Sequence, residues 1–86
     1  MIRICDFNGM VLPEISALRK LCSDVADEMY TKLLAKFRDG WEGWDDPESL
    51  PILKRKLRGH IKGGFDSENM IDVMNLAAMI WNQQQP

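Results

Sequence analysis

The chain has 86 residues, of which 45 % are hydrophobic and 28 % are charged, and its formal net charge is −2. This length and balance predict a single globular domain over residues 1–86 and argue against an intrinsically disordered chain. The acidic total charge excludes a protein that coats nucleic acid through an overall positive charge. The sequence lacks an apolar run of about 18–20 residues and the pattern of a signal peptide, so we expect a cytoplasmic protein that does not bind membranes.

The small size of the chain predicts self-association. A chain of this length buries only about 60 % of the surface that it exposes when unfolded, which makes a lone domain marginally stable. The two cysteines, Cys5 and Cys22, provide neither a zinc-ligand spacing nor a disulfide framework. Oligomerisation is the usual remaining source of stability, so we expect a homodimer or a larger homo-oligomer.

Residues 1–12 alternate weakly between apolar and polar side chains and contain the turn signal Asn8-Gly9. This pattern predicts either a short edge strand or an extended N-terminal arm that lies on a neighbouring chain.

The first predicted helix spans about residues 14–38. Pro13 suits the first turn of a helix, and Gly40 is typical of the residue that ends one. Between them, apolar residues recur at spacings of three and four, which predicts an amphipathic helix. The apolar stripe consists of Ile15, Leu18, Cys22, Val25 and Met29.

The second predicted helix spans residues 50–62. It follows a loop over 39–48 that is rich in Trp, Gly and acidic residues. Ser49 is expected at its N-cap, and the pair Gly63-Gly64 is expected to end it.

A third helix is expected over residues 67–83, with Asp66 or Ser67 as its N-cap. It is apolar on nearly all sides, and such a helix must be covered on nearly all sides. Two companion helices cannot easily do this, so we expect a partner copy to pack on it. The predicted fold class is therefore all-α, with three helices and a short N-terminal arm or edge strand, assembled as a helical homo-oligomer.

The second helix carries five Lys or Arg residues within nine positions. Guanidinium and ammonium groups suit phosphate oxygens, and their local field is positive despite the acidic total charge. The alternative is a solvated face that pairs with the acidic residues of the preceding loop. The basic residues are Lys54, Arg55, Lys56, Arg58 and Lys62, with His60 among them, and the loop acids are Glu42, Asp45, Asp46 and Glu48.

Four further residues are candidates for ligand contact. Trp41 and Trp44 lie in the loop beside the basic helix, where exposed aromatic rings can stack on a base; in small helical domains they also close the ends of the core. Asp72 and Asn75 are polar interruptions of the third helix, three residues apart on one side. A charge on a buried helix must be paired or used, so Asp72 is expected either to contact a ligand or to pair with a basic residue of the second helix.

Two other features have open interpretations. Gly59 lies inside the second helix, where it costs about 1 kcal/mol relative to Ala, which indicates a close approach at this position or a local irregularity. Asp24, Asp27 and Glu28 of the first helix could bind a divalent cation or form a solvated face.

Three segments together resemble a known family: GWEGWDDPESL, LKRKLRGHIKGG and NMIDVMNLAAMIW, within residues 40–82. They resemble small bacteriophage-type proteins that are distantly similar to the all-α MazG-like nucleotide pyrophosphohydrolases. The resemblance implies that Asp72 corresponds to an aspartate with which those enzymes hold Mg²⁺, together with three glutamates, to hydrolyse the α–β phosphate bond of nucleoside triphosphates. Asn69 stands where the family has one of those glutamates, and Glu68 is one position away.

The other expected glutamates are also absent, because the preceding helix has basic residues at this place, and Mg²⁺ requires oxygen ligands. We therefore predict a non-catalytic binding protein, with no cofactor, that holds a nucleotide or another phosphate-bearing signal and sequesters it from a host defence system. The alternatives are an inhibitor or adaptor that binds a host defence protein, and a surviving Mg²⁺-dependent pyrophosphohydrolase that uses Glu68, Asp72 and carboxylates of the first helix. The predicted ligand-binding residues are Lys54, Arg55, Arg58, His60, Trp41, Trp44, Asp72 and Asn75.

Overall fold

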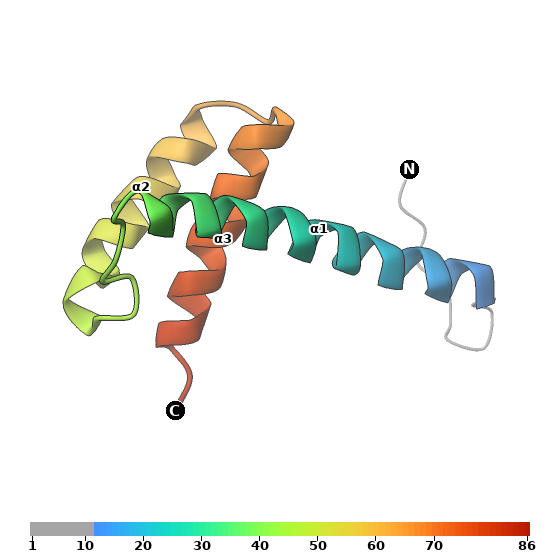
Figure 1. The fold of residues 1–86 in the computed structure, drawn as a ribbon, viewed down its shortest axis with the longest axis horizontal. Coiled ribbons are helices and arrows are strands. Elements are labelled where there is room, and N and C mark those ends of the chain that lie inside the picture. Colours follow the sequence, from blue (N-terminus) through green and yellow to red (C-terminus); the bar gives the residue numbers. More distant parts are fainter. Residues whose placement is uncertain (1–11) are drawn as a thin grey trace.

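The computed structural model describes residues 12–86, which form three α-helices (Figure 1). Their bounds are Leu12–Arg38 for α1, Leu50–Lys62 for α2 and Ser67–Gln83 for α3, with a single 3₁₀ turn, η2, at Pro47–Ser49. The predicted all-α class is thus confirmed for this part of the chain, in which no strand occurs. The N-terminal arm or edge strand was predicted for residues that lie almost entirely outside the described ones.

The ends of the helices follow from the local signals of the sequence. Gly40 has φ +90° just after α1, and Gly64 has φ +108° just after α2, a left-handed conformation that glycine adopts without a steric penalty. Asp66 caps α3, because its side chain accepts a hydrogen bond from the backbone N–H of Asn69 at 3.0 Å. Ser49 occupies the N-cap position of α2 without capping it; its hydroxyl donates to the carbonyls of Trp44 and Asp46.

The helices form an elongated molecule of 45 × 27 × 26 Å. In Figure 1, α2 and α3 form an antiparallel pair and α1 crosses this pair with its C-terminal half. The core at the crossing consists of the buried residues Leu53, Leu76 and Met79. Partly buried side chains pack around it: Leu33, Trp41, Leu57 and Ile80.

The α3 helix is better covered within its own chain than its composition predicts. It packs against both α2 and α1, and only one narrow side, which includes Ala77, Ala78 and Trp81, is exposed. The uncovered helix is α1, whose N-terminal half extends beyond α3 (Figure 1) and exposes Leu18 and Leu21. Four of the large exposed apolar side chains of these two helices lie on α1, namely Leu18, Leu21, Tyr30 and Phe37, and one, Trp81, lies on α3. Among the helices of residues 12–86, none combines the length and apolar character that a membrane span needs.

Candidate functional site

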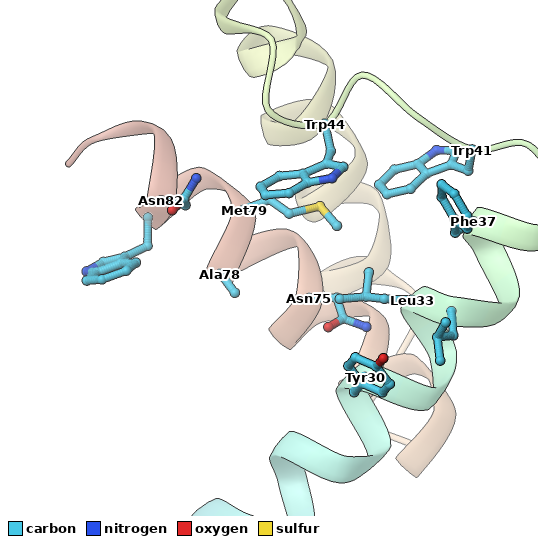
Figure 2. A pocket seen from close by; sticks show the side chains of 11 residues that line it. Tyr30, Leu33, Phe37, Trp41, Trp44, Asn75, Ala78, Met79 and Asn82 are labelled. Atoms are coloured by element: carbon cyan, nitrogen blue, oxygen red, sulfur yellow. The ribbon is translucent and has the colours of Figure 1, made fainter. Parts of the chain in front are cut away.

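An open apolar groove of about 470 Å³ lies between the C-terminal half of α1, the loop that follows it and the second half of α3 (Figure 2). Ligand pockets commonly have volumes of this order. The residues that line it are Tyr30, Leu33, Leu34, Phe37, Trp41, Trp44, Asn75, Ala78, Met79, Trp81 and Asn82.

Both predicted tryptophans line this groove. Trp41 is half-buried and packs against the core, so it closes the core and forms part of the groove wall at the same time. Trp44 is 37 % exposed. Tyr30 and Phe37 of α1, which the sequence analysis did not select, add two exposed rings. Phe37 belongs to the widened apolar stripe predicted for this helix, whereas Tyr30 lies outside it.

Asn75 is the polar residue at the centre of the groove lining (Figure 2). Its side chain donates from Nδ2 to the backbone carbonyl of Met29 at 3.4 Å, which connects α3 to α1. The residue is 3 % exposed, and no donor among residues 12–86 reaches its Oδ1 atom. A buried polar atom without a hydrogen bond costs about 1–3 kcal/mol, so the Oδ1 atom of Asn75 is an unsatisfied acceptor in the lining of the groove.

Cationic groups lie beside one end of the groove. A smaller hollow of about 40 Å³ shares Trp41 and Asn75 with the groove and is also lined by Lys36, Lys56 and His60. The Lys36 ammonium lies 5.9 Å from the centre of the Trp41 ring, within the range of a cation–π contact. The aromatic groove therefore adjoins positive charge at the Trp41 end.

Asp72 pairs with side chains of two helices. One of the two alternatives predicted from the sequence was a pairing with a basic residue of the second helix, and His60 of α2 lies within ion-pair range, with its Nδ1 atom 3.9 Å from Asp72 Oδ2. A closer partner, which was not predicted, is Lys32 of α1, whose Nζ atom lies 3.0 Å from Asp72 Oδ2. The reason is the crossing of α1 over α3, which a pattern within one helix does not reveal. Asp72 also lines the small hollow, and its Oδ1 has no hydrogen-bond partner among the described residues.

Asn69 has a structural role that the sequence analysis missed. Its Oδ1 lies 2.8 Å from Nδ1 of His60, and its Nδ2 donates to the backbone carbonyls of His60 and Gly64. It thereby holds the end of α2, the connecting loop and the start of α3 together. A hydrogen-bonding side chain close after a Gly-Gly pair and a capping aspartate was the available signal.

Three predicted ligand residues lie away from both the groove and the small hollow. Lys54, Arg55 and Arg58 are exposed on α2 and line neither of the two, whereas Lys56 lines the hollow. Their exposure agrees with the solvated face of the alternative interpretation. The pairing that this alternative also expected is not seen, because no ion pair within residues 12–86 joins the acidic loop to α2.

The carboxylates considered as cation ligands also stay apart from the groove. Asp24, Asp27 and Glu28 are exposed on α1. In the described part of the chain, no three His, Cys, Asp or Glu side chains come close enough together to hold a metal ion.

Comparisons with protein-family models, with curated proteins and with solved structures give no match for this chain. The resemblance to MazG-like enzymes therefore stays a prediction.

Proposed function

We propose that this protein is a non-catalytic binding protein that holds a nucleotide in the groove between α1 and α3. The observation that carries the proposal is the unpaired, buried Oδ1 atom of Asn75 among aromatic groove residues. A nucleobase offers both a flat apolar face and hydrogen-bond donors at its edge. The exocyclic amino group of adenine, cytosine or guanine would supply the donor that Asn75 lacks.

The aromatic residues support the binding of a base. Stacking of a base on an aromatic side chain contributes about 1–3 kcal/mol and does not require one particular base. Trp44, Tyr30 and Phe37 are exposed in the groove without being needed to fill the core. The floor, which includes Leu33 and Met79, excludes water from the base.

The phosphates of this nucleotide would lie at the Trp41 end of the groove. Lys36, Lys56 and His60 line the small hollow there, together with the Asp72 carboxylate that Lys32 engages. The small hollow, at about 40 Å³, has space for about one water molecule and not for a phosphate group. The phosphates would therefore stay at its mouth, and the exposed charges of Lys54, Arg55 and Arg58 would attract them over a longer range.

Two observations favour binding without hydrolysis. The Asp72 carboxylate is already engaged by Lys32, and no other acidic residue lines the small hollow. Under this proposal the protein acts as a homo-oligomer. In a bacteriophage-type protein, as the resemblance implies, the ligand would be a phosphate-bearing signal of a host defence system that is removed by sequestration.

Isothermal titration calorimetry with ATP, CTP, GTP and UTP, with and without Mg²⁺, tests the proposal. We expect Mg²⁺-independent binding that favours the bases with an exocyclic amino group. Asn75→Leu should weaken it roughly tenfold, the effect of one lost hydrogen bond to a buried group. Lys56→Glu should weaken it more than the matched change Arg58→Glu, because only Lys56 lines the hollow. Release of pyrophosphate from ATP, abolished by Asp72→Ala, would instead establish the hydrolase alternative.

The exposed aromatic residues also favour a second candidate, an adaptor or inhibitor that binds a host protein. Phe37 is 69 % exposed and Trp81 is 62 % exposed, and aromatic residues are enriched at protein interfaces. If this function is correct, calorimetry should detect no binding heat with any nucleotide. A defined complex with the host protein should form with the wild-type chain and be lost in the Phe37→Ser variant.

A further inference from the structure

Residues 13–28 of α1, called here the projecting segment, carry an apolar stripe that is largely exposed: Leu18, Leu21 and Cys22 are exposed, and Ile15 and Val25 are half-buried. The stripe is continuous with the part of α1 that packs on the core through Leu33. Beyond Met29, toward the N-terminus, α1 runs past α3 (Figure 1). Leu18 is 53 % exposed and Leu21 is 58 % exposed in this segment.

The projecting segment has little packing of its own to stabilise it as a helix. Isolated helices shorter than about 12–15 residues are marginal in water, and most helical stability in proteins comes from packing of an apolar face. The segment continues the packed half of α1, but it contains Ser16, Ser23 and Val25, which are weaker helix formers than alanine. A covering surface would therefore stabilise its helical conformation.

We propose that the projecting segment pairs with the projecting segment of a second copy of this chain, in antiparallel orientation. In a dimer with a two-fold axis, the same surface of both chains forms the interface. The apolar stripe of each chain would therefore bury the stripe of the other. Charge favours the antiparallel arrangement: Arg19 and Lys20 precede Asp24, Asp27 and Glu28. Antiparallel pairing brings the basic turn of each segment beside the acidic turns of the other, whereas parallel pairing sets like charges side by side.

The oligomeric state tests this interface. We expect multi-angle light scattering at micromolar concentration to give twice the chain mass. The double variant Leu18→Glu/Leu21→Glu should give the monomer mass and less helical circular dichroism. Phe65→Glu, a matched change of a residue that is 81 % exposed outside the segment, should remain a dimer. A monomeric wild-type chain, or a dimer that survives the double variant, overturns the proposal.

Cross-linking of otherwise unaltered segments tests the orientation and does not depend on a destabilising variant. In a Cys5→Ser/Cys22→Ser background, Ser16→Cys mixed with Glu28→Cys should be joined by a short bismaleimide, whereas Ser16→Cys alone should not. Efficient joining of Ser16→Cys with itself shows parallel pairing and overturns the antiparallel arrangement. Nucleotide binding is a separate readout, because neither position lines the groove.

Discussion

The Lys32 ammonium of α1 and the Asp72 carboxylate of α3 form an ion pair in which Nζ and Oδ2 are 3.0 Å apart. Their side chains are 30 % and 16 % exposed, so this pair is better shielded from water than the Lys20–Asp24 pair on the surface of α1. Lys32 also donates to the backbone carbonyl of Glu68 at 3.1 Å. The ion pair connects α1, which packs on the rest of the chain through its C-terminal half, to the antiparallel pair of α2 and α3.

Lys32→Met should destabilise the chain by about 1–3 kcal/mol, because it leaves the mostly buried Asp72 carboxylate without its partner. Adding Asp72→Asn should restore part of this loss, since the uncompensated charge is then removed. Urea unfolding of the two single variants and the double variant gives the coupling energy. The control is the exposed pair: Lys20→Met combined with Asp24→Asn should give a coupling energy below about 0.5 kcal/mol. Equal coupling energies for the two pairs would contradict the role of Lys32.

Asn69→Ala should destabilise the protein by about 2 kcal/mol, because the carbonyls of His60 and Gly64 and the ring of His60 lose their partner. Asp66→Ala, which removes only the cap of α3, should cost about 1 kcal/mol. Thermal unfolding followed by circular dichroism compares the two. An Asn69→Ala chain as stable as the wild type would show that this network does not support the α2–α3 connection.

Gly59→Ala should stabilise the protein by up to about 1 kcal/mol, the difference in helix propensity between the two residues. A Cβ atom at Gly59 meets no heavy atom within 4 Å, so a close approach within the chain does not explain this glycine. Gly64→Ala is the matched control: it also meets open space, but its φ of +108° strains an alanine, so it should destabilise. Chemical denaturation measures whether the free energy of unfolding rises, as expected for Gly59→Ala, or falls, as expected for Gly64→Ala. Loss of stability in Gly59→Ala would show that a partner molecule contacts this position.

Tryptophan fluorescence should report ligand binding in the groove. Stacking of a base on Trp44 is expected to quench its emission, and Trp44→Phe should remove most of the change while keeping an aromatic wall. Trp41→Phe should also alter unfolding, since Trp41 packs against the core. A nucleotide-dependent change that is unaffected by Trp44→Phe would place the base elsewhere.

The helix bounds were predictable because their signals are local. Gly40 and Gly64 take left-handed conformations and Asp66 caps the next helix, and each of these acts through neighbours in the chain. The predicted helices over 50–62 and 67–83 agree with the structure, and α1 begins only two residues before its predicted start. The selection of Trp41, Trp44 and Asn75 as candidate ligand residues rested on the same local reasoning, since an aromatic residue in a loop or an amide on an apolar helix is unusual in any fold; that they share one groove is seen only in the structure.

What the sequence left open depends on how the helices cross. Helical periodicity places Asp72 on a face of α3, but only the approach of α1 to α3 brought Lys32 closer to it than His60 of α2. The same crossing turned Lys56 toward the hollow and left Lys54, Arg55 and Arg58 in solvent, although all four belong to one short helix. A charge pattern shows which residues share a face of a helix. Which neighbouring helix that face contacts is determined instead by the packing of a few core side chains, Leu53, Leu76 and Met79.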